Sequence, residues 1–367
     1  MKIFFAFAFG FLFCLTGCST RPPEVKDSTP VETTLIPVIP TQTLTEAPAM
    51  TATPFPHREI TVWALYPEQL TLRQQAGTIS EVNYVWYRLG GKGSLTGTNP
   101  SPDFVKELQA MNVRVVPAIQ NVGFNADYVS YVINEKAVRS QHIQDIVTIV
   151  KTENFDGIDI DYEGLHPEDK DNFSLFIEEL SASLHGEGKL LSVTVHAKTT
   201  DIASWDGPNA QDWRRLGAAA DMFKIMTYDF TSAGGNPGPI APIAWTNDVL
   251  AYAALNVAPS KTFVGIPFYG YDYGPSKRSD VSWIVSQSII LEYNAKIQRD
   301  ENLEAFFTYD MGGLHTVYFN DAAATEGKVK AVFASHPDLK GVAIWVLGGE
   351  DPGNWAVLSQ NLPKALP

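Results

Sequence analysis

Cysteine is scarce in this chain, and long basic runs are missing. The two cysteines, Cys14 and Cys18, both lie within the first twenty residues, so the rest of the chain must fold without internal disulfides. Lys and Arg number 27 against 41 Asp and Glu, and no run of five basic residues occurs. The net charge of −14 therefore argues against nucleic acid as a partner, because binding a phosphate backbone requires clustered Lys and Arg.

Two other signals of chemistry are also missing. The seven histidines show no metal-ligand spacing, so we expect no metal ion and no cofactor. No G-x-S-x-G sequence stands at a strand-to-helix turn, which argues against a serine hydrolase of that kind.

The N-terminal residues have the pattern of an export signal. Lys2 precedes an apolar run from Ile3 to Leu15, which is too short to span a membrane but typical of the core of a signal peptide. The run ends Leu15-Thr16-Gly17-Cys18, which resembles the lipobox of bacterial lipoproteins. The resemblance implies that residues 1–17 are a lipoprotein signal peptide and that Cys18 carries lipid. The protein would then be exported and anchored to the outer face of the bacterial cell membrane. An ordinary secretory signal cut nearby is the alternative.

Residues 18–57 are rich in Pro and Thr, with few aromatic residues and no hydrophobic period. Such a stretch cannot bury enough apolar surface to offset the entropy of ordering, and its prolines keep it extended. We therefore expect a disordered tether. It either gives a catalytic body reach from a membrane or is a spacer of no particular length.

From Arg58 onward, short β-branched or aromatic runs alternate with longer amphipathic stretches, which predicts βα units and a parallel sheet. Eight such strands would close a (β/α)8 TIM barrel over residues 58–367. The expected strands are Ile60–Leu65, Val82–Tyr87, Val113–Ala118, Gly157–Tyr162, Leu190–Val195, Met222–Tyr228, Thr262–Pro267 and Gly341–Val346. The expected helices are Asp103–Met111, Ser140–Thr152, Pro167–His185, Ala210–Ala219 and Thr246–Ala254.

The stretch from about 271 to 320, between the seventh and eighth expected strands, is too long for a βα loop and its helix. It holds a helix-like run, Trp283–Gln298, followed by two strand-like runs, Ala305–Tyr309 and His315–Phe319. We expect a small α+β insertion made of a helix and a hairpin.

The fourth expected strand carries a row of acids. Asp159, Asp161 and Glu163 share one face of this strand, because strand side chains alternate, and they stand about 7 Å apart. Carboxylates this close and facing an interior cannot all ionise freely, so at least one pKa should rise. This pattern favours an acid/base site. A solvated edge strand and a cation site built from oxygen ligands are the alternatives.

Two motifs now indicate a family. The stretch from Asp156 to Glu163 reads D-G-I-D-I-D-Y-E, which resembles the D-x-x-D-x-D-x-E signature of family 18 glycoside hydrolases, the chitinase-like enzymes. The sixth strand ends Met226-Thr227-Tyr228-Asp229, which resembles the family's M-x-Y-D motif. The segments 315–321 and 341–352 look like the spore-cortex-lytic branch, whose members are N-acetylglucosaminidases acting on peptidoglycan.

The resemblance implies a retaining, substrate-assisted hydrolysis of N-acetylglucosaminyl bonds in peptidoglycan or chitin-type polysaccharide. Glu163 would protonate the glycosidic oxygen and later activate water. Asp161 would orient the substrate's 2-acetamido group, Tyr228 would donate a hydrogen bond to that group, and Asp159 would share a proton with Asp161.

Substrate contacts are expected from Asp229, Met226, Trp345, Tyr269 and Trp86. Trp345 stands near the end of the eighth strand, where the family keeps a tryptophan under the sugar, and an indole stacks on the apolar face of a pyranose. For lone aromatic residues, simple packing in the core is the alternative. His196 follows the fifth strand, but a single histidine is a weak signal of catalysis.

Two further features qualify this interpretation. Lys224 has the parity of Met226 and Tyr228 and so should point inward, where an unpaired ammonium would be costly. We hypothesise that it pairs with Asp159 or Asp156. The third strand ends Val116-Pro117-Ala118-Ile119-Gln120-Asn121, without the serine-and-glycine motif of many chitinases, which leaves the linkage preference open.

Two other functions compete with this one. A catalytically inactive, chitinase-like carbohydrate-binding protein would have the same scaffold, although such proteins typically lose the terminal acid that is present here as Glu163. A metal-dependent hydrolase that uses the acid row is the other.

Overall fold

The computed structural model describes residues 57–66, 68–99, 101–231 and 236–364. The expected signal peptide, Cys18 and all of the expected tether except His57 lie outside the described residues. None of the helices within the described ranges has the length and hydropathy that crossing a membrane requires.

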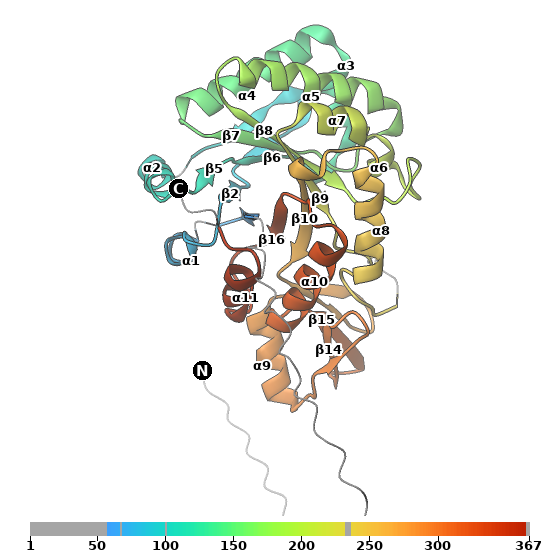
Figure 1. The fold of residues 1–367 in the computed structure, drawn as a ribbon. Coiled ribbons are helices and arrows are strands. Elements are labelled where there is room, and N and C mark those ends of the chain that lie inside the picture. The colour runs from blue at the N-terminus through green and yellow to red at the C-terminus, as the bar shows by residue number, and fades with distance from the viewer. Residues whose placement is uncertain (1–56, 67, 100, 232–235, 365–367) are drawn as a thin grey trace, which may run out of the picture. The chain divides into compact units, whose positions relative to one another are not determined.

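Eight parallel strands form a closed (β/α)8 barrel, as the sequence predicts (Figure 1). Six of them run without a break: β1 (Glu59–Ala64), β7 (Gly157–Asp161), β8 (Leu190–His196), β9 (Met222–Met226), β10 (Thr262–Pro267) and β16 (Gly341–Trp345). The second consists of β2 (Glu81–Tyr84) and β3 (Tyr87–Leu89), and the third of β5 (Arg114–Val115) and β6 (Ala118–Asn121). Pairing of β16 with β1, of β2 with β5 and of β6 with β7 closes the ring.

The breaks in the second and third strands were not predicted. Pro117 separates β5 from β6, and a proline cannot donate a hydrogen bond within a sheet. Its carbonyl oxygen still accepts from the amide of Asp159, so the barrel stays closed there. A short strand, β4 (Leu95–Gly97), adds an antiparallel edge beside β3.

Helices cover the outside of the barrel, and in Figure 1 α4, α5 and α7 lie together over β7 and β8. The expected helices appear as α2 (Pro102–Ala110), α4 (Lys136–Thr152), α5 (Lys170–His185), α7 (Trp213–Ala219) and α8 (Ile243–Ala254), with the short α6 (Asp206–Asn209) before α7. Four others were not predicted: α1 (Gln69–Gln75), α3 (Ala126–Asn134), α10 (Ala322–Ser335) and α11 (Gly353–Asn361). In α10 the buried face includes Thr325 and Lys328, and these polar residues obscure the apolar period.

The insertion between β10 and β16 is larger than the expected helix and hairpin. It holds β11 (Gly270–Tyr273), β12 (Arg278–Val281), α9 (Trp283–Tyr293), β13 (Gln298–Arg299), β14 (Ala305–Asp310) and β15 (Leu314–Phe319). The five strands form one sheet in the order β12-β11-β15-β14-β13. The helix ends earlier than predicted because Asn294 adopts a left-handed conformation, with φ 49°, which closes the last turn.

A buried glutamate ties this insertion to the barrel. Both carboxylate oxygens of Glu304 accept backbone N–H groups of the loop after β9, at Ile240 (2.6 Å) and Ala241 (2.8 Å). Lys328 of α10 supplies the compensating charge at 2.7 Å. The insertion and the loop after β9 are therefore held in one arrangement.

Two cores lie on either side of the barrel wall. Ile158, Ile160 and Tyr162 are fully buried in the outer core between the strands and the helices. Asp159 and Asp161 have the opposite parity, and the buried inner cluster includes Trp63 and Phe263. The predicted alternation of the fourth strand is thus confirmed.

Candidate active site

Glu163 lies two residues beyond the end of β7, at the mouth of the barrel. Its backbone is held by Asn121 at the end of β6, whose side-chain amide donates to the Glu163 carbonyl and accepts from the Glu163 N–H, both at 2.9 Å. Gly164 follows with φ +65°, a conformation that favours glycine and turns the chain away. The sequence analysis gave Asn121 no role, because a predicted barrel makes the third and fourth strands neighbours without showing which side chains meet at their ends.

The carboxyl group of Glu163 is protected from water and surrounded by acids. Its side chain is 18% exposed, and burial followed by the charges of Asp161 and Asp229 raises its pKa well above the ordinary value. His196 lies 3.8 Å away, but burial lowers the pKa of His196 to about 3, so it is neutral and offers no positive charge. These surroundings therefore favour the protonated form of Glu163 over that of an exposed glutamate.

Asp161 stands one step deeper in the barrel and is only 2% exposed. Burial first, and then the charge of Asp159, raises its pKa to about 7. One carboxyl oxygen, Oδ2, accepts from the side chain of Gln120 at 2.7 Å, while Oδ1 has no hydrogen-bond partner among the described residues. No hydrogen bond joins Asp161 to Asp159 within the described ranges, so the expected shared proton remains a prediction.

Asp159 lies deepest of the three and is fully buried. It accepts hydrogen bonds from the indole N–H of Trp63 at 3.1 Å and from the hydroxyl of Thr194 at 3.0 Å. The ammonium of Lys224 lies 3.9 Å from its Oδ1. The negative charge of Asp159 acts on Asp161 beside it.

Lys224 points inward as predicted, but its main partner was not foreseen. Its ammonium donates to Glu81 and to Asn83, both at 2.8 Å, and reaches Asp159 only at the longer distance given above. The alternative pairing with Asp156 is wrong. The carboxylate of Asp156 accepts instead from the backbone N–H of Val115 at 2.8 Å and from the side chain of Gln109 at 3.0 Å.

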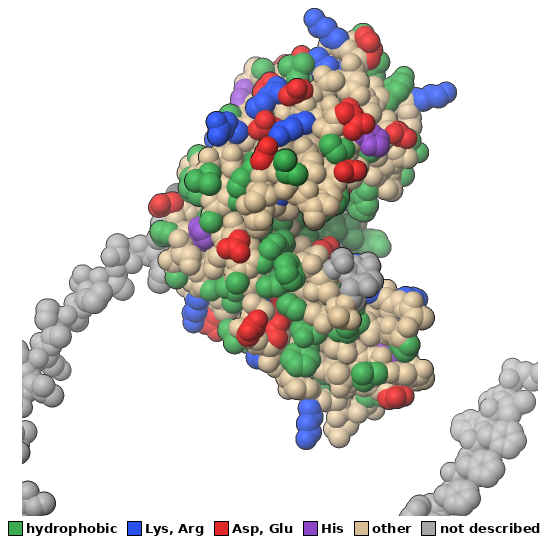
Figure 2. All heavy atoms as spheres, turned by 90° about the vertical axis from the view of Figure 1, so that its right-hand side faces the viewer, with side chains coloured by type: hydrophobic (Ala, Val, Ile, Leu, Met, Phe, Trp, Pro, Cys, Tyr) green, Lys and Arg blue, Asp and Glu red, His purple; other side chains and the backbone are tan. Residues whose placement is uncertain are grey.

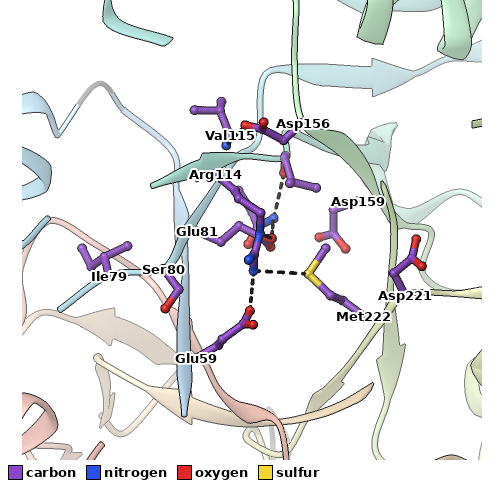
Figure 3. Close-up of polar contacts among 12 residues, drawn as sticks. Glu59, Ile79, Ser80, Glu81, Arg114, Val115, Asp156, Asp159, Asp221 and Met222 are labelled. Carbon is purple, nitrogen blue, oxygen red and sulfur yellow. Dashed lines mark hydrogen bonds and ion pairs between the residues drawn. The ribbon is translucent and has the colours of Figure 1, made fainter. Parts of the chain in front are cut away.

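The charge alternation continues below Lys224 to the other end of the barrel. Arg114 donates to Glu81 at 3.1 Å and to Glu59, and its guanidinium also lies 3.9 Å from the sulfur of Met222 (Figure 3). Lys340 then pairs with Glu59 at 2.6 Å. Each charge from Lys340 up to Asp159 therefore has a partner of opposite sign. Within the described ranges, neither Asp161 nor Glu163 has a Lys or Arg at ion-pair distance.

A cluster of tyrosines surrounds Asp229 beyond the end of β9. The backbone of Asp229 has φ +58°. Its carboxylate accepts hydrogen bonds from the hydroxyl groups of Tyr269 and Tyr271. Tyr228 packs edge-on against Tyr269, with ring centroids 6.2 Å apart. Burial, together with the charges of Asp161 and Glu163, raises the pKa of Tyr228 well above its ordinary value, so its hydroxyl keeps its proton.

The structure brings most of the predicted contact residues together. Met226, Tyr269 and Trp345 pack against the cluster that contains Tyr228, and Trp345 is half-buried with its ring 6.0 Å from that of Trp63. Trp86 is the exception. It stacks on buried Tyr84 at 4.1 Å in the outer core and is not brought to the acid row. The interruption between β2 and β3 lies at this position.

The acid row opens into a cleft of about 620 Å³. Besides the predicted Glu163, Met226, Tyr228 and Asp229, its lining includes His196 and three aromatic residues that the sequence analysis missed: Trp205, Phe230 and Trp245. Trp205 packs edge-on against His196 at 4.4 Å, and Phe230 packs against Trp245 at 5.2 Å. Trp205 and Phe230 are about half exposed, so both present apolar surface to a ligand in the cleft.

A second hollow of about 560 Å³ lies at the opposite end of the barrel, beside Arg58, Arg114, Lys340 and Lys364. The ammonium of Lys364 already donates to the carbonyl oxygens of Ala76, Ile79 and Asn112. Arg114 is paired as described above. These cations therefore close the end of the barrel. Among the described residues, no group of three or more His, Cys, Asp or Glu is arranged to hold a metal ion.

Comparison with known proteins agrees with this geometry. A family model of the glycosyl hydrolases family 18 matches residues 60–350, so the chain belongs to this family. The cortical fragment-lytic enzyme of Bacillus subtilis (strain 168) is 29% identical over 256 residues, covering 67% of this chain and 58% of that enzyme. Its counterpart from Bacillus anthracis is 27% identical, with 67% and 59% covered. This chain thus matches less than two thirds of the length of either relative.

Solved structures include the same fold. The crystal structure of a chitinase from Chromobacterium violaceum ATCC 12472 superposes with a TM-score of 0.77 at 28% identity, over 84% of this chain and 100% of that one.

The raised pKa of Asp161 predicts a pH-dependent cost in stability. Below about pH 4 the carboxyl is protonated in both the folded and unfolded chains and there is no cost. As the pH rises from about 4 to about 7, the unfolded chain releases this proton first, so the folded state loses stability. Asp161→Asn should therefore melt at a higher temperature than the parent at pH 8 and at the same temperature at pH 4. Equal melting temperatures at both pH values would contradict the assignment.

The buried pair of Lys224 and Glu81 predicts a strong energetic coupling. Lys224→Met, Glu81→Gln and the double variant form a double-mutant cycle. We expect a coupling of about 1–3 kcal/mol in the free energy of unfolding, since either single change removes the shortest ion pair of a buried charge and leaves only Arg114 for Glu81 or the more distant Asp159 for Lys224. The exposed pair of Lys330 and Glu326, 2.6 Å apart, is the control and should couple by less than about 0.5 kcal/mol. Equal coupling in the two cycles, measured by denaturant unfolding, contradicts the prediction.

Proposed function

We propose that this protein hydrolyses N-acetylglucosaminyl β-glycosidic bonds in peptidoglycan or chitin-type polysaccharide by a retaining, substrate-assisted mechanism. One observation above all supports this proposal. The carboxyl of Glu163 lies at the opening of a cleft with its pKa raised well above the ordinary value, directly above a second protected carboxyl, Asp161. A group that is protonated at neutral pH and reaches a ligand site can act as a general acid.

In the first proposed step, Glu163 donates its proton to the glycosidic oxygen as the bond to the anomeric carbon breaks. The oxygen of the substrate's 2-acetamido group attacks that carbon and forms a ring intermediate. The free Oδ1 of Asp161 accepts the acetamido N–H and stabilises the positive charge that develops there. The protonated hydroxyl of Tyr228 donates to the acetamido oxygen, which fixes its direction of attack.

In the second step, Glu163, now ionised, takes a proton from a water molecule that attacks the anomeric carbon. The ring intermediate opens, the acetamido group is restored and the configuration at the anomeric carbon is retained. Glu163 is protonated again and ready for another cycle. The neutral state of His196 suits this exchange, because a cation 3.8 Å away would hold Glu163 ionised.

The aromatic lining of the cleft fits a sugar ligand. Trp345 lies beside the tyrosine cluster, and Trp205 and Phe230 expose apolar faces of the size of a pyranose ring. The relatives' names support the same substrate class, since one group is described as cortical fragment-lytic and the solved structure is a chitinase. An N-acetyl group on the sugar is essential to the proposed mechanism, so plain glucans should not be cleaved.

Replacement of the proton donor tests the proposal. Glu163→Gln keeps the shape of the side chain but cannot deliver a proton, so hydrolysis of chitooligosaccharides and purified peptidoglycan should fall by about 10²- to 10⁴-fold while binding is kept. Glu168→Gln changes an exposed acid nearby and should leave hydrolysis unchanged. Product analysis by NMR should show the β-anomer first.

Two results would overturn the proposal. If Glu163→Gln hydrolyses these substrates at the parent rate, Glu163 is not the proton donor. A parent protein that binds these glycans but never cleaves them would instead be the inactive carbohydrate-binding protein that the sequence left open.

We also propose that the protein is lipid-anchored outside the cell through Cys18, which rests on the lipobox-like residues 15–18 alone. Labelled fatty acid supplied to expressing bacteria should attach to the parent and not to Cys18→Ala. Label on both proteins, or on neither, would end this part of the proposal.

A further inference from the structure

A smaller hollow of about 380 Å³ lies on the insertion, at the far end of the tyrosine cluster. The ring centroids of Tyr228 and Tyr269 are 6.2 Å apart, those of Tyr269 and Tyr271 5.3 Å, and those of Tyr271 and Tyr273 6.2 Å. Tyr273 lines the hollow. Packed tyrosines, most of them buried, therefore connect the acid row to this hollow, at a separation that a strand of several sugars can span.

The hollow contains a cation without an acidic partner. Arg278 of β12 lines it, with its guanidinium 3.7 Å from the ring centroid of Tyr271. Its one hydrogen bond within the described residues goes to the carbonyl oxygen of Thr231 at 3.2 Å, and none of the described carboxylates lies within ion-pair distance. Stacking on Tyr271 fixes the plane of the guanidinium, and most of its N–H groups remain available to a ligand.

Two neighbours make the hollow more suitable for an anion. Lys277, the adjacent residue, is exposed and also lines the hollow, and none of the described acids pairs with it. The hydroxyl of Tyr273 is buried beside the side chains of Arg278 and Thr231. Burial raises the pKa of Tyr273 and the charge of Arg278 opposes this rise, which places the two groups near one another.

Among the described arginines, Arg278 shares its lack of a carboxylate partner with Arg58, Arg88 and Arg214. Five of the other arginines form ion pairs with carboxylates: Arg73, Arg114, Arg139, Arg215 and Arg299. On the face drawn in Figure 2, Lys and Arg side chains are likewise scattered among Asp and Glu. A half-buried guanidinium that lacks such a partner beside a ligand cleft has the features of a carboxylate-binding group.

We propose that Arg278, aided by Lys277 and the Tyr273 hydroxyl, binds a carboxylate carried by the glycan substrate. The inference rests on the proposed function and narrows its substrate class. Chitin carries no acidic group, whereas a peptidoglycan strand carries carboxylates on its lactyl groups or on its peptide stems. The cleft itself is lined by acids, which repel an anionic strand, and the Arg278 site offsets that repulsion along the wall formed by the insertion. The site therefore favours peptidoglycan over chitin.

The test compares one variant on substrates that differ in charge. Arg278→Gln removes the cation, and we expect kcat/KM to fall by about tenfold to a hundredfold on acidic glycan strands, mainly through a higher KM. On a chitooligosaccharide of equal length the change should stay within about twofold, since that substrate makes no ionic contact. Peptide-free strands and stem-bearing strands are assayed separately, so that the larger loss identifies the lactyl or the stem carboxylate as the ligand.

A second experiment removes the negative charge from the substrate instead of the positive charge from the protein. Amidation of the strand's carboxylates should lower kcat/KM of the parent to that of the variant and should abolish the difference between them. Arg299→Gln is the control variant, because it lies in the same insertion but its guanidinium is already paired with Asp321 at 2.7 Å. It should affect acidic and neutral substrates equally.

The outcomes separate this inference from the proposed function. A parent protein that cleaves none of these glycans contradicts the function itself. A parent that cleaves them, with Arg278→Gln changing acidic and neutral substrates by the same factor, overturns the carboxylate site and leaves the hydrolase proposal intact.

Discussion

The interior of this barrel depends on a balance of buried charge. From Lys340 at one end, through Glu59, Arg114, Glu81 and Lys224 to Asp159, positive and negative groups alternate along the barrel. Because burying a charge is costly unless it is paired, each of these residues requires the next. The alternation stops at Asp159. Asp161 and Glu163 follow without a Lys or Arg at ion-pair distance among the described residues, and burial together with the neighbouring acids raises the pKa of each.

The geometry of β7 places these buried acids together at the candidate active site. The period of two on β7 points Asp159, Asp161 and Glu163 along one face of the strand, and the parallel direction of the barrel strands puts the last of them at the opening. The Asn121 side chain then fixes the backbone of Glu163 from the neighbouring strand. The buried acids Asp161 and Glu163, whose burial is costly, are thus also held by hydrogen bonds from β6.

Much of this could be predicted from the sequence. The eight barrel strands and the inward face of β7 follow from local periodicity and from motifs that each lie within a single strand. The position of the insertion follows from chain length alone. These features need no knowledge of which segments are neighbours in space.

The errors and omissions concern contacts between segments that are distant in the sequence. The pairing of Lys224 with Glu81 joins residues 143 positions apart, and no local pattern shows it. Trp86, by contrast, has the parity of Tyr84, which lies in the outer core, so alternation along the strand already placed its side chain outside the barrel and the sequence analysis did not apply that test. Trp205, Phe230 and Trp245 belong to loops and a helix that follow different strands, so only the closed barrel brings them to one cleft.

The contacts of the buried Glu304 limit how the insertion can change. Since this one side chain holds the backbone at Ile240 and Ala241 and is itself neutralised by Lys328, the insertion is not an appendage that can be trimmed or exchanged by itself. Removing the insertion would remove the hydrogen bonds that hold the loop after β9. It would also leave the buried ammonium of Lys328 in α10 without its carboxylate partner. A change in the insertion that leaves the loop after β9 in place must therefore preserve the contacts of Glu304.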